Sequence, residues 1–157
     1  MNIKKFYIFL GIVTILFTAS IFAFKINGSE PAKNENGAPV RIQIRDAEIR
    51  AEEAATPDER AQGLSGRLAL ADNEGMFFVF DTPDYYQFWM KDMNFPLDII
   101  WIGEDLVIKD IKENISPETF PMAFSPASPA LYVLEAQAGF SRKNGLITGD
   151  KVIIHEE

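Results

Sequence analysis

The chain has 157 residues, 47% of them hydrophobic and 24% charged, which is the composition of one globular domain with a short additional segment. The formal charge is −8; residues 1–25 contain three Lys and no acid, so the remainder carries 12 basic and 23 acidic side chains. That excess argues against binding to nucleic acid, which needs Lys and Arg to displace the counterions of phosphates. The lack of Cys excludes disulfides and thiolate chemistry, and a single His, His155, excludes a histidine triad or a multi-histidine metal site.

The uncharged N-terminal run, residues 6–24, has the length of a membrane-spanning helix, which needs about 20 apolar residues. Lys4 and Lys5 precede the run and only Lys25 follows it. The positive-inside rule therefore places the N-terminus in the cytoplasm and the rest of the chain outside. The alternative is a signal peptide cleaved near the small residues at 18–20, which would release a secreted protein. We favour the uncleaved anchor.

These patterns divide the chain into three parts. Residues 1–25 form the membrane anchor or signal segment. Residues 26–39 are polar, contain Gly, Pro and Asn, and form a flexible linker. Residues 40–157 form a globular domain that is expected to be extracytoplasmic, in the periplasm or outside the cell.

Short segments of alternating or continuous apolar residues predict strands throughout the domain. A helix is predicted to begin at Thr56, which forms a capping box with Glu59, and to end near Gly66. In chain order, the predicted elements are strands at 40–44 and 47–54, a helix at 56–65, strands at 76–80, 86–93, 97–102, 106–115 and 131–136, a helical turn at 140–144 and a strand at 151–155.

Many short strands with one definite helix predict an α+β domain with a mostly antiparallel, curled, barrel-like sheet and one or two short helices. Residues 116–130 interrupt the strand pattern with four Pro. This segment is either a lid or partner-docking loop, or a crossover that packs on the sheet.

Residues 88–98, FWMKDMNFPLD, concentrate aromatic, thioether and charged side chains on one predicted strand. Alternation along a strand places Trp89 and Lys91 on one face and Asp92 on the other. A binding cleft is one interpretation, because an exposed Trp beside a Lys is uncommon without a ligand. The alternative is a strand with one core face and one solvent face.

Two carboxyl groups, Asp98 and Glu135, alternate with apolar residues and are predicted to point toward the core. A buried acid needs a partner or has a raised pKa, and both conditions also create general acid–base pairs. One hypothesis is therefore a hydrolase or lyase that uses Asp98 and Glu135 as acid and base. In the structural alternative, Asp98 accepts backbone N–H bonds and Glu135 pairs with Arg60 or Arg67.

Six blocks of the sequence occur in an order that marks a family: residues 56–64, 75–80, 88–91, 96–98, 132–135 and 149–150. Over residues 40–154 the chain resembles the family called domain of unknown function 192. The resemblance implies a compact, barrel-like α+β fold, often behind an export signal, and it implies no activity. Asp92 and Met93 stand where Asn and Thr are usual in the family, so a ligand preference set by these positions would differ here.

The leading hypothesis is a non-enzymatic, extracytoplasmic binding domain, tethered to the membrane through residues 6–24. Its partner is expected to be an unknown small ligand or an envelope protein, without a metal or a cofactor. Alternatives are the hydrolase or lyase and an assembly module of the envelope. The predicted ligand-binding residues are Trp89, Lys91, Asp92, Asp98 and Glu135.

Overall fold

The structure, a computed structural model, describes residues 39–155. The predicted membrane segment lies outside these residues, as does all but the end of the predicted linker. Within the part of the chain that the structure describes, no helix has the length and apolar character needed to span a bilayer.

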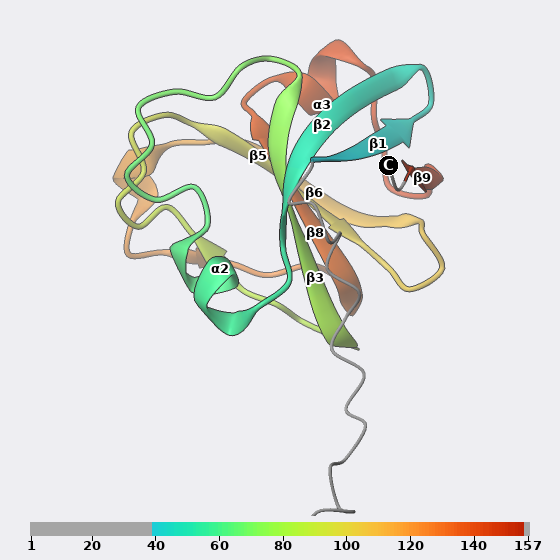
Figure 1. The fold of residues 1–157 in the computed structure, drawn as a ribbon, viewed down its shortest axis with the longest axis horizontal. Coiled ribbons are helices and arrows are strands. Elements are labelled where there is room, and N and C mark those ends of the chain that lie inside the picture. Colours follow the sequence, from blue (N-terminus) through green and yellow to red (C-terminus); the bar gives the residue numbers. More distant parts are fainter. Residues whose placement is uncertain (1–38, 156–157) are drawn as a thin grey trace, which may run out of the picture. The chain divides into compact units, whose positions relative to one another are not determined.

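Residues 39–155 form mostly strands, with two short helices and one 3₁₀ turn (Figure 1). The helices are α2 (Pro57–Gln62) and α3 (Phe140–Lys143), and the 3₁₀ turn is η1 (Pro117–Thr119). The strands are β1 (Val40–Ile44), β2 (Ala47–Ala54), β3 (Glu74–Asp84), β4 (Phe88–Trp89), β5 (Leu97–Ile102), β6 (Ile108–Ile115), β7 (Ala123–Phe124), β8 (Ala130–Gln137) and β9 (Val152–His155).

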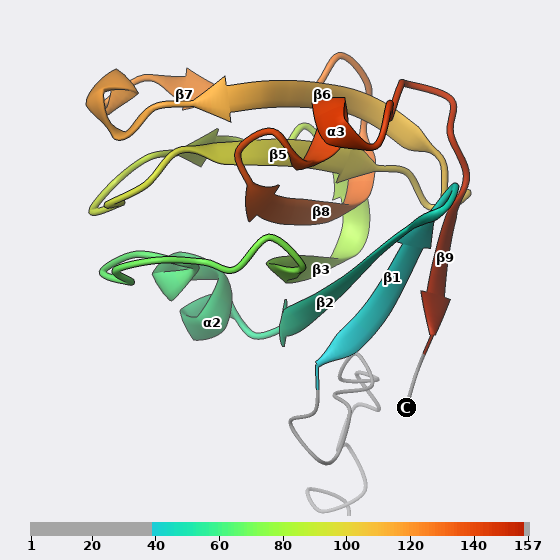
Figure 2. The ribbon, with the colours of Figure 1, turned by 90° about the horizontal axis from the view of Figure 1, so that it is seen from above.

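Seven strands form one curled sheet in the order β6-β5-β8-β3-β2-β1-β9, which can be followed in Figure 2. Neighbouring strands are antiparallel except β2 and β3, which are parallel and joined through α2. At one end the two edges of the sheet meet, because Val107 bridges to Lys151 and the Ile108 N–H donates to the Asp150 carbonyl. The result is a half-barrel, and β4 and β7 form a separate two-stranded ribbon.

The predicted curled sheet is confirmed, although its one parallel pair makes it mixed. The capping box that begins α2 is formed, with the Glu59 N–H donating to Thr56 Oγ1 at 3.2 Å. The helix ends at Gln62, earlier than predicted, because Gly63 leaves the helical conformation, with φ 50° and ψ −139°, a combination that glycine adopts without strain. The glycine that ends the helix is therefore Gly63 and not Gly66.

The strand predicted over residues 86–93 is wrong for most of its length. Only Phe88–Trp89 is a strand, and the chain turns at residues 91–92, where Asp92 has φ 55°. The two residues of β4 pair with β7, which lies in the Pro-rich segment between β6 and β8. That segment therefore packs on β4, in agreement with the crossover interpretation.

Both faces of the sheet bury apolar side chains. One core, enclosed by the curl, takes residues from all seven strands of the sheet and includes Phe77 and Leu134. A second core on the other face includes Phe78 and Val133. Because side chains alternate along a strand, adjacent residues of β3 and β8 enter different cores.

Gly75 lets β3 and β8 approach closely in the middle of the sheet. A Cβ atom at this position would lie 2.6 Å from the Glu135 carbonyl oxygen and 3.1 Å from Ile49 Cδ1. No carbon atom tolerates the first distance, so any larger side chain must push β8 away from β3.

We expect Gly75→Ala to lower the free energy of unfolding by about 2–4 kcal/mol, because it overpacks the centre of the sheet. Urea denaturation of the two proteins measures the difference. Gly66→Ala is the matched control: its Cβ meets no atom within 4 Å, and its φ of 80° costs only about 1 kcal/mol. Equal losses in the two variants would show that close packing at Gly75 is unimportant.

Candidate functional site

Glu135 lies in β8, and its cross-strand neighbours are Met76 on β3 and Ile99 on β5. The residue is 5% exposed, and burial among these apolar neighbours raises the pKa of its carboxyl to about 8. Among residues 39–155, no side chain or backbone group forms a hydrogen bond or ion pair with this carboxyl. Such an arrangement is costly, because a buried acid is ordinarily paired.

A cavity of about 250 Å³ adjoins Glu135 on the face of the second core. Exposed side chains, including Gln62, Gln87 and Trp89, also line it, so the cavity opens to the surface. Five aromatic residues contribute to its wall: Phe78, Phe80, Tyr86, Phe88 and Trp89. The site is therefore a pocket with five aromatic residues in its wall and one buried carboxyl.

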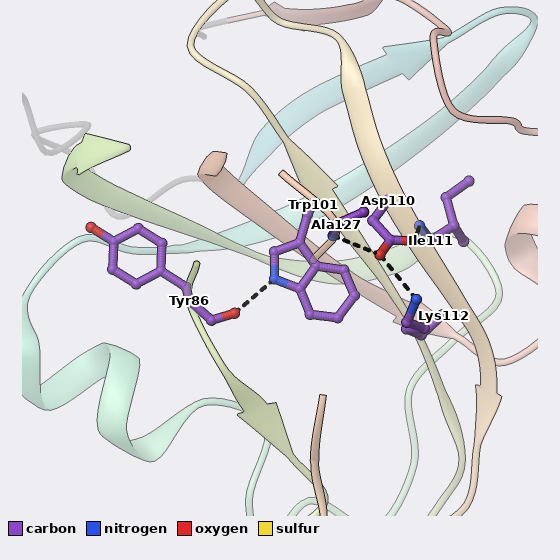
Figure 3. A network of polar contacts seen from close by, with 6 residues as sticks. All are labelled: Tyr86, Trp101, Asp110, Ile111, Lys112 and Ala127. Atoms are coloured by element: carbon purple, nitrogen blue, oxygen red, sulfur yellow. Dashed lines mark hydrogen bonds and ion pairs between the residues drawn. The ribbon is translucent and has the colours of Figure 1, made fainter. Parts of the chain in front are cut away.

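The hairpin of β5 and β6 holds the segments around this cavity in place. Trp101 Nε1 donates to the Tyr86 carbonyl at 2.9 Å, which attaches one aromatic wall to β5 (Figure 3). Opposite Trp101 on β6, Asp110 Oδ2 accepts from the Ala127 N–H at 3.0 Å and from Lys112 Nζ at 2.9 Å. Ala127 belongs to the crossover that carries β7, so the same hairpin also positions the β4–β7 ribbon.

Neither arginine that was predicted to pair with Glu135 does so. Arg60 lines the same cavity, but its Nη1 donates to two backbone carbonyls, one of them that of Val79 at 2.8 Å. Arg67 forms two bonds with Glu52, at 2.5 and 2.7 Å, and this contact lowers the pKa of the Glu52 carboxyl. The carboxyl of Glu135 therefore has a cationic residue in its cavity without an ion pair.

Asp98 has a structural environment. It is fully buried, and its carboxylate accepts three backbone N–H bonds, from Asn114 at 2.8 Å, Gly139 at 3.1 Å and Ser141 at 2.8 Å. The first bond stabilises the end of β6, where Asn114 has φ 53° and the register with β5 shifts. The other two hold the first turn of α3 against the sheet.

Asp98 and Glu135 are not brought together. Glu135 is the cross-strand partner of Ile99, and such partners point to the same face of a sheet. Asp98 precedes Ile99 and therefore points to the opposite face. The predicted acid–base pair is corrected accordingly: both residues point into a core, as expected, but the sheet has a core on each side.

Of the other predicted site residues, Trp89 lines the Glu135 cavity and Lys91 and Asp92 do not. Lys91 and Asp92 are exposed and lie in the turn after β4. Their backbone carbonyls accept from the Ser65 hydroxyl and the Gly66 N–H, so this turn braces the loop after α2. The prediction that Trp89 and Lys91 share a face required the strand to continue beyond β4. The chain turns there, so the two side chains do not share a face of a strand.

Phe80 and Tyr86 belong to the site and were not predicted from the sequence. Their rings stack with centres 3.5 Å apart, and both line the cavity. The unbroken apolar run at residues 76–80 is a signal for Phe80, because a strand with apolar side chains on both faces must have other parts of the protein packed on both faces. The even-numbered residues of that run then share a face with Met76, which is the partner of Glu135.

Two other cavities lack an unpaired buried group. One, of about 240 Å³, is lined by Asp72 and Lys143, which form an ion pair at 3.4 Å. The other, of about 420 Å³, is lined by the Glu52–Arg67 pair and by further acids. In the described ranges no cluster of three or more His, Asp or Glu side chains is arranged to hold a metal.

The raised pKa of Glu135 makes stability depend on pH. Between its unfolded value of 4.5 and its folded value of about 8, the folded protein binds more protons at this site, so stability falls as pH rises. Glu135→Gln removes the titration. We therefore expect the free energy of unfolding of this variant, relative to that of the wild-type protein, to increase by about 2–3 kcal/mol when the pH is raised from 5.5 to 8.5. Each pKa unit is worth about 1.4 kcal/mol.

Urea denaturation of both proteins at the two pH values measures this increase. The contributions of all other titrating groups to the free energy of unfolding cancel when the two proteins are compared. A stability difference that stays constant with pH would show that the Glu135 carboxyl is ionised in the folded protein.

Comparison with known proteins identifies the family of this chain. Residues 40–154 match domain of unknown function 192 (DUF192), described as "Uncharacterized ACR". A candidate transcription regulator from Sinorhizobium meliloti 1021 is 32% identical, with a TM-score of 0.68 over 74% of this chain and 92% of that chain. A protein of unknown function from Novosphingobium aromaticivorans DSM 12444 is 34% identical, with a TM-score of 0.68 over 81% of this chain and 94% of that chain. No curated protein matches. The chain belongs to the DUF192 family.

Proposed function

We propose that the domain binds a small, partly apolar ligand in the cavity formed by Glu135 and its aromatic neighbours. The observation that supports this function best is the buried Glu135 carboxyl, which has no hydrogen-bond or ion-pair partner among residues 39–155. Asp98 provides the comparison, because it is equally buried and its three N–H bonds satisfy it. A destabilising group beside an open cavity is characteristic of functional sites.

Binding accounts for the site better than catalysis. The other titratable side chains that line the cavity are those of Arg60 and Tyr86. Arg60 is bonded to backbone carbonyls, and the Tyr86 hydroxyl donates to the Thr82 carbonyl at 2.6 Å. Both groups are therefore bonded elsewhere, and neither forms an acid–base pair with Glu135.

A second candidate function is docking of an envelope protein on the β4–β7 ribbon. Trp89 is 55% exposed and Met122 52%, and Trp89 contacts the ring of Phe120 with centres 5.9 Å apart. Large apolar side chains that gather at a surface are a common feature of interfaces. Both functions would be carried out outside the cytoplasm if residues 6–24 anchor the chain as proposed.

Native mass spectrometry of the full chain, extracted in detergent from its own membrane, tests the first function. We expect a small additional mass on the wild-type protein, reduced at least about tenfold in Trp89→Ala, which removes a wall of the cavity. Tyr85→Ala is the control, because Tyr85 is similarly exposed (53%) and does not line the cavity. Retention of the mass in Trp89→Ala would place the ligand elsewhere, and co-purification of only a protein chain would favour docking.

The proposed topology is tested by labelling, since the chain contains no Cys. Leu68→Cys places a thiol at a side chain that is 87% exposed. In intact spheroplasts we expect a membrane-impermeant maleimide to label this variant and to leave Asn2→Cys unlabelled, because the positive-inside rule keeps the N-terminus in the cytoplasm. The reverse pattern would place the domain in the cytoplasm.

A further inference from the structure

We propose that the cavity recognises an organic ammonium group, with the Glu135 carboxylate as its counter-ion and the surrounding aromatic rings as the rest of its shell. This inference rests on the proposed binding function and names the chemistry of the ligand. It follows from three features of the site: the unpaired acid, the aromatic wall and the way in which the one nearby cation is already bonded.

The wall of the cavity suits a cation. The faces of aromatic rings carry negative charge density, which attracts an ammonium group placed within about 6 Å of the ring centre. Phe78 and Phe88 meet edge to face with centres 4.8 Å apart, so the two rings stand at an angle beside Glu135. Trp89, the best ring type for such contacts, stands at the mouth.

The buried acid supplies the matching charge. Its neighbours on both adjacent strands, Met76 and Ile99, are apolar, so these strands offer the carboxylate no partner, and a cation that enters the cavity would supply one. An anionic ligand would add a like charge in a site of low polarity. A neutral ligand would leave the negative charge without compensation and would use Glu135 only in its protonated form.

Arg60 does not take the place of this ligand. The centre of its guanidinium lies 5.1 Å from the centre of the Phe80 ring, and its Nη1 bonds the Ala55 and Val79 carbonyls. Arg60 therefore already shows, within this site, a cation held over an aromatic face. Burial alone accounts for the raised pKa of Glu135, so the charge of Arg60 leaves the carboxylate to be neutralised by another group.

The direction of the pH dependence distinguishes the ligand classes. A permanent cation binds the ionised carboxylate, so below a pKa of about 8 its binding must release a proton. Its affinity then rises by up to about tenfold per pH unit from pH 6 to pH 8 and levels off above. A neutral ligand that accepts a hydrogen bond from the protonated carboxyl loses affinity over the same range.

Choline and 3,3-dimethylbutan-1-ol are suitable probes, because they have the same shape and differ in having a charged nitrogen or a neutral carbon. Titration calorimetry of the full chain in detergent is expected to show that choline binds at least tenfold more tightly than the alcohol. Glu135→Gln is expected to weaken the binding of choline at least tenfold more than it weakens the binding of the alcohol. Repeating the wild-type titration in two buffers of different ionisation enthalpy should show proton release at pH 7.

Equal affinity for the two probes, absence of choline binding, or choline binding without proton release would overturn the ammonium assignment. The proton-release measurement needs no variant, so it decides the question even if Glu135→Gln is poorly folded. The proposed binding function is judged separately, by the small mass that native mass spectrometry detects. A mass lost in Trp89→Ala together with equal affinity for choline and the alcohol would keep the binding function and reject the ammonium.

Discussion

The structure depends on a central strand, β8, that is covered on both faces. Its neighbours β3 and β5 bond both of its edges, the curl of the sheet encloses one face, and irregular segments after α2 and around β4 cover the other. The side chains in the middle of β8 point into one core or the other, and that of Glu135 meets the cavity beside the second core. A polar residue there must be satisfied within the protein or by something that enters it.

Asp98 and Glu135 show the two outcomes of this constraint on adjacent strands. Asp98 faces the enclosed core, where α3 and the end of β6 bring three backbone N–H groups to its carboxylate. Glu135 faces the other core, where its strand neighbours offer only apolar side chains. The two carboxyl groups therefore differ in hydrogen bonding because different segments pack on the two faces of the sheet. The backbone N–H groups at the start of a helix and at a bulge donate hydrogen bonds to a buried carboxylate, whereas packed apolar side chains have no donor to offer.

The fold was more predictable than the site for a physical reason. Strands such as 40–44 and 97–102 and the capping box at Thr56 are local patterns, and each was predicted close to its observed place. Which face of the sheet a buried acid occupies depends on the register between strands, which a single sequence does not show. Asp98 and Glu135 were thus correctly predicted to be buried and wrongly paired. The turn at Asp92 was missed because its left-handed backbone has no glycine to signal it.

The site lies under the less regular of the two covers. The first face is enclosed mainly by the curled strands, whose hydrogen bonds fix their spacing, whereas the second is closed by the loop after α2 and by the β4–β7 ribbon with the turn that follows β4. Segments of this kind pack less regularly and leave cavities, which is why binding residues often lie on loops above a rigid scaffold. Beyond residue 25 the chain also carries 23 acidic and 12 basic side chains. A surface with this excess of negative charge attracts cations toward any opening in it, and here the opening leads to a buried carboxylate that has no hydrogen-bond or ion-pair partner among the described residues.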